Sequence, residues 1–142
     1  MATFQRFEEI NAWKKSRELT RDIYRVTKQG PFSKDFGLRD QIRNASSSVM
    51  SNIAEGFERS GNGEFGQFLS IAKGSIGEVK CQLYIAVDQE YLDKETFEIL
   101  FSNATEISKM ISGLMSHIRD SSIKGIKYKN DVILFRNLRL ET

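Results

Sequence analysis

Five polar residues in the stretch from Phe36 to Arg59 are the first candidates for chemistry, because they recur at helical spacing. The members of this polar stripe are Gln41, Ser48, Asn52, Glu55 and Arg59. On a helix these positions share one face, where their polar groups must be satisfied by a ligand, by water or by a packed neighbour. We expect a structural hydrogen-bond network, within the chain or between subunits, that fixes register and assembly. The alternative is a small-molecule pocket lined by Asn52 and Glu55.

Residue types that usually carry out catalysis are sparse in this chain. His117 is its only histidine, and a lone histidine is more often a surface or helix-end residue than a general base. Cys81 is its only cysteine, and we expect it to be buried as a small apolar residue. No His, Cys and carboxylate cluster has metal-ligand spacing, and the Gly61–Gly63 pair follows a helix rather than a strand. We therefore predict a non-enzymatic protein with no catalytic, cofactor-binding or metal-binding residues.

Basic side chains gather between Trp13 and Lys28, where they recur on one face of a predicted helix. A helix face of this kind can reach one phosphate backbone, whereas the bland alternative is an ordinary solvated surface. Two arginines of the next helix would extend the surface if the helices pack suitably. The candidate nucleic-acid-binding residues are Lys14, Arg17, Arg21, Arg25, Lys28, Arg39 and Arg43.

Acidic side chains gather in a different part of the chain, between residues 88 and 106. They are Asp88, Glu90, Asp93, Glu95, Glu98 and Glu106. The formal net charge of +2 therefore hides a segregation of charge, which predicts a dipolar surface. An acidic patch suits a protein partner, so the alternative function is a protein-interaction scaffold or assembly adaptor that makes no direct contact with nucleic acid.

Apolar residues at helical spacing predict the elements that position these groups. Four helices are expected, at about residues 11–29, 36–57, 64–89 and 94–120, and the last carries an a/d heptad seam. Gly30-Pro31, a loop at 60–63 and a turn at 91–93 separate them. Long helices with short connections predict an all-α, up-down-up-down antiparallel four-helix bundle, formed as one domain by residues 1–120.

Glycines inside the third predicted helix suggest that another element approaches it closely. Gly66, Gly74 and Gly77 each disfavour a helix relative to alanine, so close packing would explain their presence. Gly74 and Gly77 therefore join the polar stripe as candidate structural or interface residues.

Residues 121–142 differ from the rest, and we expect them to form a non-helical or strand-like C-terminal tail. The run from Val132 to Phe135 is β-prone and lies among basic residues and aromatics, a composition that suits either RNA binding or docking. The chain contains no apolar run long enough to span a membrane and no signal-type N-terminus, so we expect a cytoplasmic protein without a membrane partner.

The run FGLRDQIRNASSSVMSNIAEGFERS, with WKKS at residues 13–16, resembles the four helix bundle protein family, also described as the 23S rRNA intervening-sequence protein family. Its most specific part is the segment from Ser48 to Gly56. The resemblance covers about residues 7–118. Glu58 departs from it, because family members often have glycine there, and so does the tail after Asp120.

This resemblance implies a four-helix bundle that commonly assembles as a homopentameric ring. Some members are encoded in insertions within large ribosomal RNA genes. A similar protein is the accessory variability determinant of diversity-generating retroelements, which assists a reverse transcriptase and contacts RNA. We therefore expect a homo-oligomer, with a pentamer favoured, that binds RNA or DNA, and a reverse transcriptase is a further expected partner.

Overall fold

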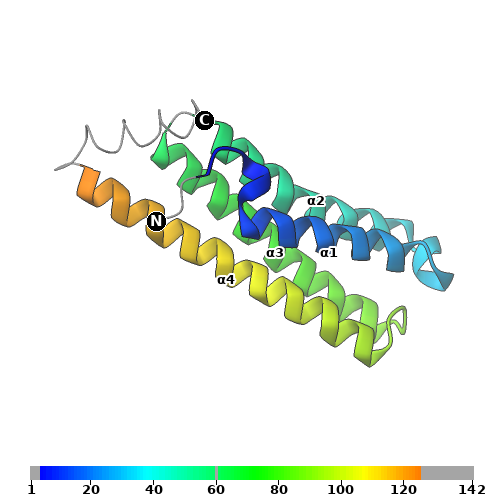
Figure 1. Ribbon diagram of the computed structural model, residues 1–142. Helices are drawn as coiled ribbons and strands as arrows, with labels where there is room; N and C mark the ends of the chain where they lie inside the picture. The colour runs from blue at the N-terminus through cyan, green and yellow to red at the C-terminus, as the bar shows by residue number, and fades with distance from the viewer. Residues whose placement is uncertain (1–3, 60, 126–142) are drawn as a thin grey trace.

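The structure is a computed structural model, which describes residues 4–59 and 61–125, with side chains described as far as residue 120. Four long helices run alternately up and down: α1 (Asn11–Thr27), α2 (Phe36–Glu58), α3 (Asn62–Asp88) and α4 (Lys94–Gly125). Two short 3-10 helices, η1 (Phe7–Glu9) and η2 (Gly30–Lys34), precede α1 and α2. Figure 1 shows the four helices packed side by side as an antiparallel bundle. The predicted all-α bundle is confirmed, and the described residues include no strand.

Local sequence signals set the ends of these helices. After α1, Gly30 adopts a φ of 51°, a left-handed conformation that glycine accepts without strain. Asp35 caps α2 by accepting a hydrogen bond from the Leu38 N–H at 3.1 Å. Asp93 caps α4 in the same way, from the Thr96 N–H at 2.7 Å. The side chains of Asp35 and Asp93 thus set where α2 and α4 begin.

The core consists of the apolar stripes of all four helices. The largest fully buried side chains include Leu19 and Ile23 of α1, Ile42, Val49 and Ile53 of α2, Leu69, Ile76 and Leu83 of α3, and Ile107 and Ile111 of α4. α1 packs against α2 and α4, and α3 packs against the same two helices, so α1 and α3 are diagonal neighbours. The outer faces of α1 and α3 therefore point to opposite sides of the bundle.

The expectation that another element packs closely on the glycines of α3 is wrong for the described residues. A Cβ added to Gly66, Gly74 or Gly77 would meet no heavy atom of the described residues within 4 Å. Gly74 and Gly77 lie on the exposed face of α3. The helices are close instead at Gly56 of α2, where an added Cβ would lie 2.7 Å from the Cβ of Phe68.

The last helix is longer than expected. α4 continues to Gly125, so the predicted helix end at residue 120 is wrong by five residues. The strand-like prediction for the rest of the tail falls on residues 126–142, which lie outside the described residues. None of the described helices is long and apolar enough to cross a membrane.

Candidate nucleic-acid interface

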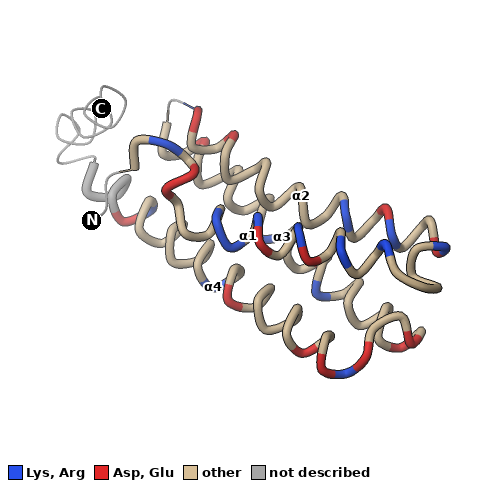
Figure 2. The backbone as a smooth tube through the Cα atoms, turned by 45° about the vertical axis from the view of Figure 1, so that its right-hand side comes forward, with Lys and Arg blue, Asp and Glu red and all other residues tan. Residues whose placement is uncertain are grey.

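The outer face of α1 carries five of the seven predicted nucleic-acid-binding residues. Figure 2 shows basic residues recurring along this helix. The five residues, named here the basic face, are Lys14, Arg17, Arg21, Arg25 and Lys28, and all are exposed. The buried side of α1 is formed by Ala12, Ser16, Leu19, Ile23 and Thr27. Because helical residues alternate with a period of 3.6, the basic face lies opposite the core and is open to solvent.

Most cations of the basic face have no acidic partner in the described part of the chain. Arg25 is the exception, since its Nη1 lies 2.8 Å from Oδ1 of Asp22. Lys14, Arg17, Arg21 and Lys28 form no ion pair with any residue in the described ranges 4–59 and 61–120. The guanidinium of Arg17 lies 5.9 Å from the ring centroid of Trp13, a contact that leaves its N–H donors available.

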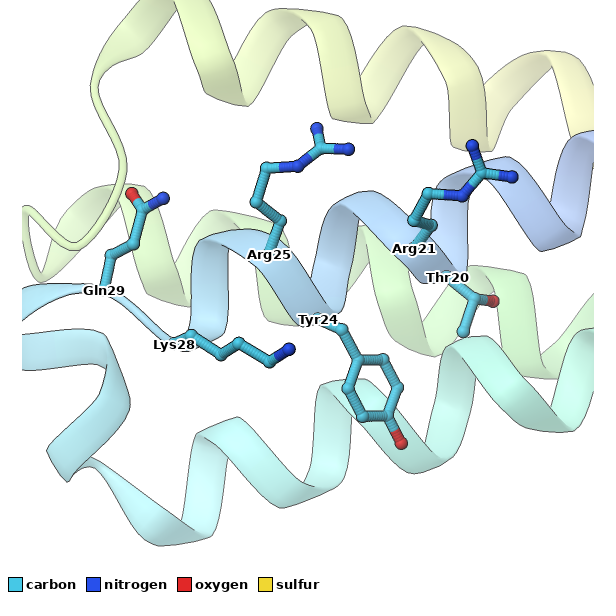
Figure 3. A pocket seen from close by; sticks show the side chains of 6 residues that line it. All are labelled: Thr20, Arg21, Tyr24, Arg25, Lys28 and Gln29. Carbon is cyan, nitrogen blue, oxygen red and sulfur yellow. The ribbon is translucent and has the colours of Figure 1, made fainter.

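A shallow groove of about 430 Å³ lies at the C-terminal half of the basic face. Its lining residues are Thr20, Arg21, Tyr24, Arg25, Lys28 and Gln29. In Figure 3, Arg21 and Arg25 extend to one side of α1, and Tyr24 extends to the other side over α2. The groove thus combines three cations with hydroxyl and amide donors, which are the groups that proteins use to hold phosphate oxygens.

Arg43 of α2, also predicted to bind nucleic acid, is used to join two helices. Its Nε donates a hydrogen bond to Oγ1 of the buried Thr27 at 2.8 Å, and its guanidinium lies 4.7 Å from the Tyr24 ring centroid. Thr27 in turn donates to the Ile23 carbonyl at 2.7 Å. Arg43 therefore braces the α1–α2 contact beside the basic face.

Arg39, the seventh predicted residue, is held at the N-terminal end of α2. Its Nε lies 2.9 Å from Oδ1 of Asp40, and its Nη1 donates to the Ser33 carbonyl at 3.1 Å. The guanidinium also lies 4.8 Å from the Phe36 ring centroid. These contacts occupy Arg39 locally and tie the η2 turn to α2.

Most of the predicted acidic residues belong to the end of α3, the start of α4 and the turn between them. Figure 2 shows acidic residues concentrated at the turn between α3 and α4. Glu106, farther along α4, forms an ion pair with α1, because its Oε2 lies 3.0 Å from Nζ of Lys15. The pKa of Asp93 is lowered by the hydrogen bonds it accepts from Thr96, which favour the ionised carboxylate.

The polar stripe of α2 is satisfied largely by short-range and inter-helix hydrogen bonds. The hydroxyls of Ser48 and Ser75 lie 3.0 Å apart and connect α2 with α3. Asn52 donates to the carbonyl and hydroxyl oxygens of Ser48 at 2.8 and 3.0 Å. The stripe thus supplies a hydrogen-bonded link between the two helices.

Arg59 and Glu55 form an exposed ion pair at the end of α2. Nη2 of Arg59 donates to Oε2 of Glu55 at 2.6 Å, and Nη1 lies 3.9 Å from Oε2 of Glu64. The hydrogen bond to Glu55 raises the pKa of Arg59. The Arg59 guanidinium also lies 5.2 Å from the ring centroid of Phe68 on α3, so it links the ends of the two helices.

A polar groove of about 540 Å³, named here the α2–α3 groove, lies next to the polar stripe. The sequence does not predict this groove, because its α3 wall forms only where α3 packs beside α2. Its lining residues are Gln41, Asn44, Ala45, Ser48, Ser75, Glu78 and Gln82. Gln41 and Ser48 of the polar stripe line this groove. Asn52 and Glu55, the two residues expected to line a pocket, do not.

The residues considered for catalysis do not converge on a site. Cys81 is exposed, so the expectation that it is buried is wrong. His117 is half-buried, and its Nε2 has no hydrogen-bond partner among the described residues. No group of three or more His, Cys, Asp or Glu in the described ranges has the arrangement of a metal site.

Comparisons with known proteins agree with the fold. No curated protein matches the chain. A crystal structure of a protein of unknown function from the S23 ribosomal protein family of Bacteroides thetaiotaomicron is 25% identical, with a TM-score of 0.67. That match covers 73% of this chain and 97% of the crystallised chain. The sequence model described as 23S rRNA-intervening sequence protein matches residues 8–113. Since this match spans well over half of the sequence, the chain belongs to the 23S rRNA-intervening sequence protein family.

Proposed function

We propose that this protein binds the phosphate backbone of RNA or DNA through the basic face of α1, without an enzymatic activity of its own. The observation that carries the proposal is the set of four exposed cations on one helix face that have no acidic partner in the described ranges. Cations that lie along one helix face without acidic partners can neutralise phosphates and release the counterions of a nucleic acid.

The dimensions of the basic face favour a backbone contact. Lys14 and Lys28 are separated by about 21 Å along the helix axis, at a rise of about 1.5 Å per residue. One strand of B-DNA carries a phosphate about every 3.4 Å, so the face spans roughly six phosphates. The Tyr24 ring already packs against Arg43. Contacts between the cations of the basic face and phosphates would position a nucleic acid without reading its bases.

A homo-oligomer, with a pentamer favoured, completes the proposal. The outer face of α3 exposes apolar side chains, with Ile71 and Tyr84 each 52% and Ile85 43% exposed. A second copy of the chain that covered this helix would bury these side chains. Because α3 lies diagonally opposite α1, an assembly built on α3 would leave every basic face accessible. Several weak faces on one particle would bind a long polyanion with strong avidity. A cytoplasmic location is part of this proposal.

The test is a filter-binding salt series with structured RNA and duplex DNA as separate probes. The wild type should show a slope of log affinity against log salt of about −4 per protomer for duplex DNA. The Arg17→Gln, Arg21→Gln double variant should roughly halve that slope. The matched control is Lys73→Gln, Lys94→Gln, which removes two exposed charges from α3 and the start of α4. Equal losses in both double variants, or no binding of either probe at low salt, would refute the proposal.

A protein-interaction scaffold is the second candidate function. Two observations favour it: the exposed apolar side chains of α3, and the acidic turn between α3 and α4, which adjoins that helix. A partner such as a reverse transcriptase would then contact this side of the bundle. The salt series separates the two functions, because a scaffold of this kind would bind no nucleic acid at low salt while a partner would still be retained.

A further inference from the structure

An exposed tyrosine lies in the wall of the groove on the basic face. Tyr24 is 38% exposed and lines this groove together with Thr20 and Lys28, which lie one helical turn to either side of it. Its ring contacts no other aromatic ring of the described residues. In Figure 3 the Lys28 side chain extends toward the Tyr24 ring. The groove therefore offers an accessible aromatic ring beside a cation that forms no ion pair in the described ranges.

Arg43 holds the Tyr24 ring in place from α2. Its guanidinium lies 4.7 Å from the ring centroid, and its Nε donates to the buried Thr27 at 2.8 Å. A guanidinium over an aromatic ring covers one of the two faces of that ring. The exposure of Tyr24 is that with Arg43 in place, so side-chain surface stays open to the groove. A ring that is already held loses little conformational freedom when a planar ligand stacks on it.

Phe36 repeats this arrangement at the start of α2. The residue is 63% exposed, and the Arg39 guanidinium lies 4.8 Å from its ring centroid. Phe36, Arg39 and Arg43 are spaced by three and four, so they form one row along α2. Because Arg43 bonds to α1, this row follows the side of α2 that adjoins α1. Phe36 lies about 10 Å from Arg43 along the helix axis. A second exposed ring, also backed by an arginine, thus lies near the first.

We propose that Tyr24 and Phe36 stack unpaired bases of a single-stranded nucleic acid whose phosphates are held by the basic face. Proteins that bind single strands combine a cationic groove with aromatic rings, because every base has a planar face that can stack. The bases of a duplex are stacked on one another and do not reach a surface ring. Lys28 would contact a phosphate next to the base on Tyr24. Arg39 and Arg43 would act by holding the two rings. The inference rests on the proposed function and adds that the ligand is single-stranded.

The experiment compares labelled oligothymidylate with an abasic strand of the same length, which keeps the phosphates but has no bases. Fluorescence anisotropy at one salt concentration gives both affinities, and their ratio measures stacking. The wild type should bind oligothymidylate at least about tenfold more tightly than the abasic strand. Tyr24→Leu and Phe36→Leu should each lower this ratio at least about fivefold. Tyr24→Phe keeps the ring and should keep the ratio.

Tyr84→Leu is the matched control, because it removes an exposed tyrosine ring from α3, which lies diagonally opposite α1. It should leave the ratio at the wild-type value. Oligouridylate and its abasic counterpart form the RNA arm, and a ratio of at least about tenfold in either arm supports stacking on that nucleic acid.

The outcomes separate this inference from the proposed function. Equal binding of base-bearing and abasic strands in both arms overturns stacking and leaves the phosphate contact intact. No binding of any strand at low salt refutes the proposed function and the inference with it. Stacking on Tyr24 is also overturned if Tyr24→Phe lowers the ratio as much as Tyr24→Leu does, or if Tyr84→Leu lowers it equally.

Discussion

Replacement of Gly56 by alanine tests the packing of α2 against α3 most directly. The added Cβ would lie 2.7 Å from the Cβ of Phe68 and 3.0 Å from Cδ1 of Phe65. Carbon atoms prefer a separation of about 3.5–4.0 Å, so the contact with Phe68 requires a movement of roughly 1 Å. A Cβ atom is fixed to its backbone, so Phe68 cannot relieve the contact by a change of rotamer. The two helices must separate locally, which disturbs the buried side chains around them.

The expected cost follows from two opposing effects. Overpacking of a filled core destabilises proteins by about 1–3 kcal/mol, whereas alanine stabilises a helix interior by up to about 1 kcal/mol relative to glycine. We expect Gly56→Ala to lower the free energy of unfolding by about 1–2 kcal/mol. That change corresponds to a fall in Tm of roughly 4–8 °C for a domain of this size.

Gly74→Ala is the matched control, because it makes the same chemical change in a helix where no atom of the described residues lies within 4 Å of the added Cβ. Without a steric contact, the variant should gain about 0.4–1 kcal/mol of stability. Urea and thermal unfolding followed by circular dichroism at 222 nm measure both changes. The steric contact at Gly56 is refuted if Gly56→Ala is as stable as the wild type, or if the two variants shift Tm in the same direction. A loss of assembly mass in Gly74→Ala would show instead that this face of α3 contacts a second copy.

Two further predictions concern single contacts. Arg43→Gln should lower the free energy of unfolding by about 1 kcal/mol through loss of its contacts with Thr27 and Tyr24. Arg21→Gln, measured in parallel by urea unfolding, should change it by less than about 0.5 kcal/mol, so equal losses would contradict the bracing role. The pKa of Asp93 is lowered in the folded state, so its contribution to stability is present above its ordinary pKa of 3.8 and is lost as pH falls through the folded value. Asp93→Asn should remove that part of the acid dependence, and identical acid-unfolding curves would contradict it.

Much of the fold could be predicted from the sequence because its signals are local. The apolar steps of three and four residues in α2 and α4 identify the buried faces without knowledge of any neighbour. Asp93 begins α4 through its own side chain, and that position is confirmed. α1 ends at Thr27, two residues before the predicted end, and Gly30 takes its left-handed conformation three residues later. The basic face of α1 is also a single-helix property, since the period of 3.6 places its cations opposite the core. Whether that face binds nucleic acid stays a prediction.

Contacts between helices depended on the tertiary structure. Gly56 and Gly74 are both glycines within helices, yet only the pairing of α2 with α3 decides that one is crowded and the other exposed. Arg43 and Arg21 are both arginines on predicted helix surfaces, but the position of α2 beside α1 directs Arg43 onto Tyr24 and leaves Arg21 free of ion pairs among the described residues. Helical periodicity determines which side of each helix is buried. It does not determine which helix covers that side or at what register, and that information decides where the α2–α3 groove forms.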